Sequence, residues 1–197
     1  MTTQNGLDAP EIVKEVLGPA KVLGGSCYVN DWIEEPGIID LLGPPIPDKL
    51  IIAEAWTATG EYVNSDNKQP MDRVNKLAAA FVDTKTEIVV ADDGIWTHLW
   101  AKAGIVCCTG PVQSLVRAPL STIATVPETR ALLRGTMLEW ATLRKAAGYH
   151  PGSETLEEVV DGLLEKIAGS PLGMTTSTAR DIMGGKPSEL HELTGSL

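Results

Sequence analysis

The stretch GIWTHLWAKAGIVCC, Gly94 to Cys108, separates two halves of the chain that differ in pattern, and it carries one lysine in an otherwise apolar and aromatic run. Four of its apolar residues follow the i, i+3, i+4, i+7 spacing of one helical face: Trp96, Leu99, Trp100 and Ala103. The residues before it alternate between strand-like and helix-like segments, whereas those after it are helical. We therefore expect an α/β part over residues 1–93 and an all-α part over residues 94–197.

The α/β part contains two predicted helices and three predicted strands. Helical spacing predicts a helix over 9–18 that stops at Gly18. A second helix is predicted over 70–85, with one apolar face formed by Val74, Leu77, Ala78 and Phe81. Clusters of β-branched and aromatic residues predict strands over 21–33, 48–60 and 86–93. The prolines of 36–49 predict a loop between the first two strands.

The second half predicts a series of helices. A long helix is expected over 126–148. The segment 153–169 has the clearest pattern, because Thr155 and Glu158 form a capping-box motif before an apolar stripe. The last segment, 176–195, predicts a helix, a glycine break and a second helix. Both ends of the chain lack a flanking element, so we expect a piece of a larger fold.

Composition excludes several classes of function. The formal net charge of −10 argues against nucleic acid and anionic membranes as main partners. No apolar run approaches a membrane span, and the opening residues lack the features of a signal peptide. Three cysteines without a C-x-x-C motif, and the scattered His98, His150 and His191, indicate neither a disulfide framework nor a metal site. A cytoplasmic protein without a metal is therefore the expectation.

The lysine in the opening stretch, Lys102, has two interpretations. Lysine is rarely buried without a partner, so its stem can lie on the apolar face while the ammonium stays in water. Alternatively, partial desolvation lowers the pKa of the ammonium and makes Lys102 a proton donor near neutral pH. The stretch alone favours the first interpretation.

Other candidate residues give weaker signals. Ser177 and Asp181 are four residues apart and share one helical face, which equally suits an ordinary hydrogen bond. Glu189 is expected in the first turn of a helix that begins near Ser188, where the helix dipole favours a carboxylate. Asn5 lies in a turn signal, and Cys107 and Cys108 are expected to be buried. No G-x-G-x-x-G or Walker motif occurs in the sequence.

The order of these elements is more specific than any one of them. The segments TTQNG, VLGGSCYVNDWIEEPG, DDGIWTHLWAKAGI and STARDIMGGKPSELHELTG follow one another along the chain. Together they resemble the ketopantoate reductase (2-dehydropantoate 2-reductase) family, and the resemblance covers essentially the whole sequence. The last motif is the most specific: Ser-x-x-x-Asp, then Gly-Lys-Pro-Ser-Glu and a later glycine. The Trp-x-Lys element comes next.

The resemblance implies a fold, a reaction and a set of residues. The fold would be the remnant of a Rossmann-type sheet followed by a helical domain like the C-terminal domain of 6-phosphogluconate dehydrogenases. Lys102 would be the catalytic lysine, which protonates the keto oxygen of a small 2-keto acid as NADPH delivers hydride. Ser177 would bind the substrate carboxylate, Glu189 the cofactor, and Asn5 both cofactor and substrate.

Two departures from the family pattern qualify this implication. The family usually places asparagines four and eight residues after the lysine, where this chain has Val106 and Gly110. An apolar 2-keto acid would therefore suit it better than ketopantoate. The Rossmann half with its G-x-G-x-x-G is also missing, which leaves a non-catalytic binding or dimerisation module as the alternative. Because a sheet that lacks strands has an open edge, we expect a homodimer. The pathway, pantothenate synthesis or specialised metabolism, stays open.

Overall fold

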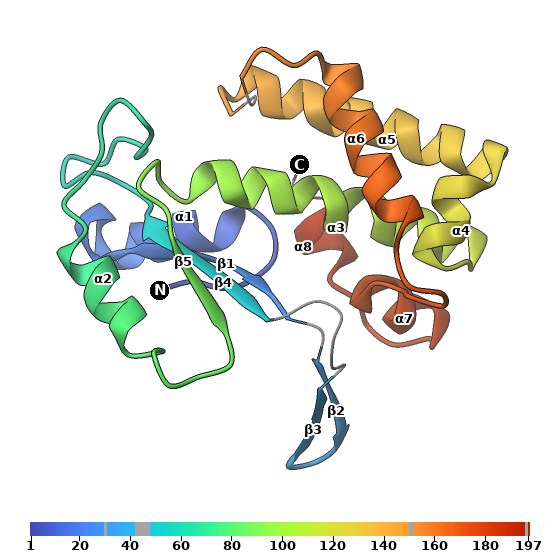
Figure 1. Ribbon diagram of the computed structural model, residues 1–197, viewed down its shortest axis with the longest axis horizontal. Coiled ribbons are helices and arrows are strands. Elements are labelled where there is room, and N and C mark those ends of the chain that lie inside the picture. The colour runs from blue at the N-terminus through green and yellow to red at the C-terminus, as the bar shows by residue number, and fades with distance from the viewer. Residues whose placement is uncertain (30, 42–47, 150–151, 196) are drawn as a thin grey trace. The chain divides into compact units, whose positions relative to one another are not determined.

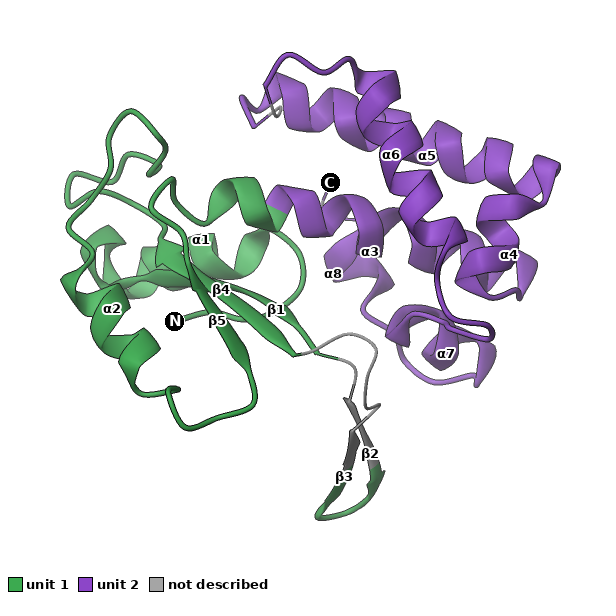
Figure 2. Ribbon diagram, viewed as in Figure 1, with its two compact units in different colours: residues 1–99 green, residues 100–197 purple. Residues whose placement is uncertain are grey.

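The structure, a computed structural model, describes residues 1–29, 31–41, 48–149, 152–195 and 197. The chain forms two compact units, residues 1–99 and 100–197 (Figure 2). The boundary falls within α3 (Trp96–Val116), which begins in the first unit and continues into the second. Each unit is described separately below.

The first unit is built around a small mixed sheet (Figure 1). β1 (Leu23–Tyr28) pairs antiparallel with β4 (Lys49–Glu54), and β4 pairs parallel with β5 (Glu87–Val90). The three strands stand in the order β1-β4-β5, and Thr2 adds a single parallel bridge to Gly24 of β1. The strands predicted around 48–60 and 86–93 are confirmed, although both are shorter than their predicted ranges.

A hairpin stands where the sequence predicted a loop. β2 (Asp31–Glu35) pairs antiparallel with β3 (Ile38–Leu41), so the predicted strand over 21–33 is divided between β1 and β2. The prediction of a loop over 36–49 was wrong for Ile38–Leu41 and for Lys49, where β4 begins. Pro36 and Gly37 form the turn of the hairpin, and β-branched isoleucines follow at once. The remaining prolines, in 42–47, lie outside the described residues.

Helices pack against this sheet. α1 (Asp8–Leu17) ends at Gly18, whose φ of 82° is accessible to glycine, so the predicted stop is confirmed. The turn η1 (Pro19–Lys21) follows. α2 (Asp72–Ala79) is shorter than predicted, but its apolar face is confirmed: Val74 is fully buried against Leu23, Leu50 and Ile52, with Leu77, Ala78 and Phe81 beside it. Arg73 of α2 pairs with the buried Glu54 of β4.

The second unit is all helical. After α3 come α4 (Leu120–Thr125), α5 (Pro127–Ala146), α6 (Leu156–Ala168), α7 (Ser177–Met183) and α8 (Leu190–Leu193). The four helices α3, α4, α5 and α6 share one hydrophobic core. Its centre is formed by fully buried side chains: Ile123, Leu133, Met137 and Leu164. The capping box is confirmed, because Thr155 Oγ1 accepts from Glu158 N while a Glu158 carboxylate oxygen accepts from Thr155 N. The fold class predicted from the sequence is thus confirmed.

α3 and α5 approach each other closely at Gly104. A Cβ at this position would lie 2.4 Å from Cζ2 of Trp140, so only glycine admits the indole. The same indole donates its Nε1–H to the carbonyl of Trp100 at 3.2 Å. Along the described parts of the chain, we find no helix with the length and apolarity that crossing a membrane requires.

Candidate functional site

Lys102 lies in the first half of α3, and its side chain is half-buried. Successive steps of four, three and four residues place Val106, Thr109 and Gln113 on the same side of the helix. Val106 is half-buried, whereas Thr109 and Gln113 are buried. The face of α3 that carries Lys102 therefore runs from a half-buried end into the interior of the unit.

Gln113 holds the segment that leads to Ser177. Its side-chain Oε1 accepts from the backbone N–H of Thr176 at 2.9 Å. Its Nε2 donates to the carbonyl oxygens of Ala118 at 3.2 Å and Met174 at 3.3 Å. Because Gln113 has no exposed surface, these bonds satisfy an amide that would be costly to bury otherwise.

Ser177 is the first residue of α7, and it is exposed. Thr176 caps the helix, since its hydroxyl accepts from Ala179 N at 3.2 Å. The start of α7 also packs on α3, where a Cβ at Gly110 would lie 3.2 Å from Cβ of Thr178. An asparagine at position 110 would have to displace this threonine. Asp181 is half-buried one turn after Ser177 in the same helix.

The end of α8 is bonded to α3 at Cys107. The Cys107 thiol donates to the carbonyl of Leu193 at 3.5 Å, and the Thr194 hydroxyl donates to the carbonyl of Cys107 at 2.9 Å. Pro111 explains why this carbonyl is available: proline has no N–H, so the helical bond from residue 111 to residue 107 does not form. A break in the helical bonding of α3 thus anchors the C-terminal segment.

Glu189 occupies a different position from the one predicted. It is the cap residue before α8, not a member of its first turn, and its exposed side chain makes no capping hydrogen bond. The helix begins at Leu190 and not near Ser188, so Glu189 lies outside its first turn, and with four residues α8 has little dipole to favour a carboxylate. The backbone carbonyl of Glu189 accepts from Leu193 N at 2.9 Å.

Asn5 belongs to the first unit. It lies half-buried in a bend between the Thr2 bridge to β1 and the start of α1. The structure therefore places it at the entrance of a helix, in the kind of turn that its sequence context indicated.

Two cavities lie elsewhere. One, of about 170 Å³, lies in the second unit between α3, α5 and α6. The other, of about 310 Å³, lies in the first unit beside Trp56 and the Glu54–Arg73 pair. Neither of them is lined by Asn5, Lys102, Ser177 or Glu189. The structure fastens the segments of Ser177 and Glu189 to the helix of Lys102, but it does not bring these side chains into either cavity.

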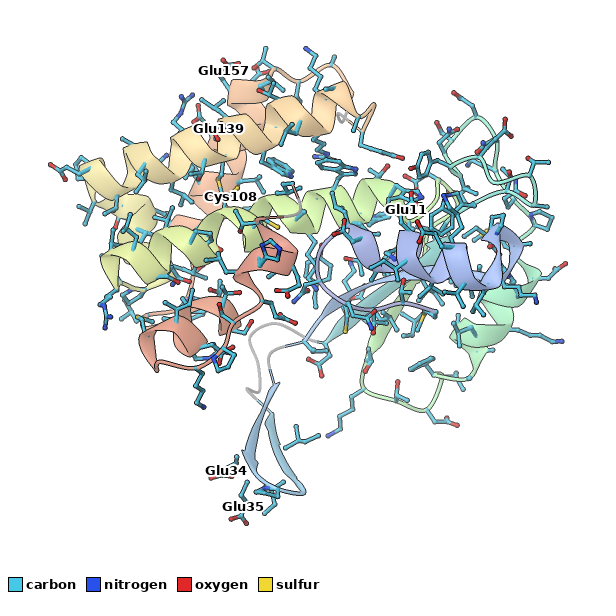
Figure 3. All side chains as sticks on the ribbon, turned by 180° about the vertical axis from the view of Figure 1, so that it is seen from behind. Glu11, Glu34, Glu35, Cys108, Glu139 and Glu157 are labelled. Carbon is cyan, nitrogen blue, oxygen red and sulfur yellow. The ribbon has the colours of Figure 1, made fainter. Side chains whose placement is uncertain are left out.

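The adjacent cysteines are buried, as predicted. Burial raises the pKa of Cys107 to about 11. Burial, and then the charges of Cys107 and of Glu139 on α5, raise the pKa of Cys108 to about 12 (Figure 3). Both thiols are therefore protonated at neutral pH, a state that does not suit a nucleophile. Among the described residues, no group of three or more His, Cys, Asp or Glu side chains is arranged to hold a metal ion.

Sequence reasoning missed two buried polar residues of the second unit. Gln113 lies in the mostly apolar segment VCCTGPVQSLV, and its position on the same side of the predicted helix as Lys102 was the available signal. Arg144 lies in the helix predicted over 126–148 and was not singled out there, although it is only 5% exposed. Neither residue has a spacing motif, because the groups that surround them come from distant parts of the chain.

A family model and a curated relative both match this chain to ketopantoate reductases. The family described as ketopantoate reductase PanE/ApbA C terminal matches residues 94–197. A 2-dehydropantoate 2-reductase of Mesorhizobium japonicum is 24% identical over 199 residues, which include all of this chain and 54% of the relative. The chain thus spans about half the length of the curated relative that it matches.

Solved structures share the fold. A dimeric ketopantoate reductase from Staphylococcus aureus superposes with a TM-score of 0.74 at 20% identity, over 99% of this chain and 58% of that one. A ternary complex of D-mandelate dehydrogenase with NADH and anilino(oxo)acetate gives a TM-score of 0.77 at 13% identity, over 98% of this chain and 58% of that one. At these identities the similarity establishes the fold.

Proposed function

Because this chain belongs to the ketopantoate reductase family, we propose that it forms the substrate-binding and proton-donating part of an NADPH-dependent reductase of a small 2-keto acid. The substrate is 2-dehydropantoate or a related acid. Residues 1–93 are the α/β part of this reductase, and residues 94–197 are its helical substrate domain. The supporting observation is that α3, which carries Lys102, binds both the start of α7 and the end of α8.

In this proposal Lys102 is the general acid. Reduction adds a hydride to the carbonyl carbon and a proton to the oxygen, which gives a 2-hydroxy acid. The half-buried position of Lys102 on α3 suits the donation of this proton, since partial desolvation makes an ammonium a stronger acid. Proton donation of this kind contributes about 10² to 10⁴ in rate.

Ser177 binds the substrate carboxylate. As the first residue of α7, it offers its hydroxyl and a backbone N–H at the end of the helix where these groups lack helical partners. Gln113 and Gly110 support this role indirectly, because they fix the backbone on which Ser177 stands.

NADPH supplies the hydride when it is bound. Asn5 and Glu189 are the proposed contacts: an amide and an exposed carboxylate that suit the hydroxyl and amide groups of a nicotinamide riboside. The sequence contains no G-x-G-x-x-G, so these residues do not account for the pyrophosphate. The proposed activity therefore depends on a dinucleotide-binding domain that holds this part of the cofactor.

We also propose that the protein works as a homodimer in the cytoplasm, associated through its helical part. The S. aureus ketopantoate reductase with the same fold is a dimer. In the first unit, β5 pairs with β4 on one side, and an edge of this kind is commonly covered by other parts of an assembly. Gel filtration with light scattering should give twice the mass of the chain, and a stable monomer would contradict the proposal.

A non-catalytic binding or dimerisation module is the second candidate. Val106 and Gly110 favour it, since both stand where the resemblance implies asparagine. Titration of the chain with NADPH, followed by cofactor fluorescence, separates the two. Saturable binding at micromolar NADPH would contradict the non-catalytic module. Absence of binding at millimolar NADPH would contradict catalysis by this chain alone.

A further inference from the structure

The cavity of the second unit has a buried cation in its wall. Its volume is about 170 Å³. Trp140 and Arg144 of α5 line it together with Ala101 of α3. The opposite wall comes from α6 and the residues just before it: Glu154, Glu158, Val159, Gly162, Leu163 and Lys166. None of these residues belongs to the site proposed above.

Arg144 is buried, and no carboxylate of the described residues forms an ion pair with it. It is 5% exposed, and its Nε has no hydrogen-bond partner among the described residues. Its guanidinium lies over the ring of Trp140, with Cζ 5.5 Å from the ring centroid. Burial lowers the pKa of Arg144, but an arginine stays charged in proteins. A buried charge that lacks an anionic partner is unfavourable, so the site calls for an anion.

Two other arginines of α5 show the contrast. Arg130 donates to Glu165 at 2.8 Å, and Arg134 donates to Asp161 at 2.8 Å. Both pairs link α5 to α6 at exposed positions. Arg144 lies in the same helix and lines the cavity together with residues of α6, yet it forms no ion pair with a carboxylate among the described residues.

The two glutamates in the cavity wall, Glu154 and Glu158, are exposed. Glu158 is held by the capping box, where its Oε2 accepts from the backbone N and the hydroxyl of Thr155 at 2.7 and 3.0 Å. Lys166 adds a second cation to the wall. Apart from these residues and Arg144, the wall is apolar and aromatic.

We propose that this cavity binds a small monocarboxylate with an apolar or aromatic body. The carboxylate pairs with the Arg144 guanidinium, and the body packs against Trp140 and Leu163. The volume is suitable, because an apolar cavity of about 150 Å³ accommodates benzene. A charge-assisted bond to a guanidinium is roughly twice as strong as a neutral hydrogen bond, which favours a carboxylate over an uncharged group.

Gly162 provides the matched control. It lies within α6 and in the cavity wall, and nothing lies within 4 Å of a Cβ built on it. A leucine at position 162 therefore fits without a clash, and we expect it to occupy part of the cavity while Arg144 stays in place. Gly135 of α5 is also a helical glycine with open space, and it does not line the cavity. A leucine at position 135 should therefore leave the cavity free to bind a ligand.

The test is titration of the whole chain with benzoate, followed by the indole N–H signals in ¹⁵N correlation spectra, with the Trp140 signal assigned through Trp140→Phe. We expect a saturable shift of the Trp140 signal. Arg144→Met should weaken benzoate binding about tenfold or more, the effect of a lost charge-assisted bond, whereas Arg134→Met should leave it unchanged. Gly162→Leu should abolish the shift and Gly135→Leu should retain it, so the proposal stays testable even where one variant fails to fold.

Two further probes separate the parts of the proposal. Benzamide has the same ring without the charge and should bind at least about tenfold more weakly than benzoate. Inorganic phosphate has charge without the apolar body, and it should also bind more weakly. The proposal is overturned if benzoate leaves the Trp140 signal unmoved, if Arg144→Met binds it as the wild type does, or if benzamide or phosphate binds equally well.

Discussion

The hydroxyl of Thr194 donates to the backbone carbonyl of Cys107 at 2.9 Å, the carbonyl that Pro111 leaves without its helical partner. A proline within a helix is usually unfavourable, because it removes a hydrogen bond and strains the preceding turn. Here the unpaired carbonyl accepts a hydrogen bond from the side chain of Thr194, near the C-terminal end of the sequence. The segment after Glu189 is thus bound to the helix that carries Lys102 through a defect in that helix.

This relationship predicts a coupling between positions 111 and 194. Thr194→Val should lower the free energy of unfolding by about 1 kcal/mol, since it leaves the Cys107 carbonyl unpaired. In a Pro111→Ala background, the new N–H pairs with this carbonyl, and the effect of Thr194→Val should fall to a few tenths. A double-mutant cycle by urea denaturation measures both values. Equal effects in the two backgrounds would show that Pro111 has no part in the anchoring.

The contact between α3 and α5 predicts opposite effects of alanine at two glycines. Gly104→Ala should destabilise the protein by about 1–3 kcal/mol, because its Cβ would overlap the ring of Trp140. Gly135→Ala should stabilise it by about 0.5–1 kcal/mol, because it adds helix propensity in open space. Thermal or urea unfolding of the two variants gives the signs. Stabilisation by Gly104→Ala would mean that the helices do not pack as described.

The buried thiols predict a fall of stability at alkaline pH. In the unfolded chain a cysteine ionises near its ordinary pKa of 9, whereas in the folded chain the pKa values of Cys107 and Cys108 are raised to about 11 and about 12. Between pH 9 and 11 the unfolded state therefore binds fewer protons than the folded state. The free energy of unfolding should fall as pH rises, by up to about 1.4 kcal/mol per pH unit for each thiol.

Comparison with the Cys107→Ala/Cys108→Ala variant isolates this effect, since Tyr62, whose pKa is raised to about 12, is present in both proteins. The variant should have a flatter profile than the wild type from pH 9 to 11. Parallel profiles would indicate that the thiols are solvated in the folded protein.

Local patterns predicted most of the helices. The capping box at Thr155 and the helix end at Gly18 depend on residues that are close in sequence, so both can be predicted from the sequence alone. The β2–β3 hairpin was missed because the prolines after it were taken to extend the loop backward over Ile38–Leu41. The length of α8 was overestimated, because Thr194 and Gly195 were taken as part of the helix, whereas it ends at Leu193.

The candidate site was less accessible to sequence reasoning. Lys102, Ser177, Glu189 and Asn5 came from the order of motifs, and their roles remain predictions. What the sequence did not indicate is how Ser177 is positioned: Gln113 binds the backbone of Thr176, 63 residues away. A contact of this range leaves no local pattern, because either residue is compatible with many neighbours.

Position 106 predicts the substrate preference. Val106 is half-buried one turn after Lys102 on the same side of α3, so a substrate held at Lys102 meets an apolar group. The wild type should prefer 2-ketoisovalerate to ketopantoate, which has an additional hydroxymethyl group. Val106→Asn should shift the ratio of kcat/KM toward ketopantoate by about 10-fold or more. Steady-state rates with both acids provide the measurement, and a strong wild-type preference for ketopantoate would contradict the prediction.

The most direct test of the proposed reaction is the rate of NADPH oxidation that depends on a 2-keto acid, measured with a dinucleotide-binding domain present and compared between the wild type, Lys102→Met and Lys145→Met. Lys145 is an exposed lysine in the last turn of α5 and serves as the matched control. If Lys102 is the proton donor, its replacement should lower kcat about 100-fold or more while Lys145→Met keeps the wild-type rate. A Lys102→Met variant that reduces the keto acid as fast as the wild type would contradict the account.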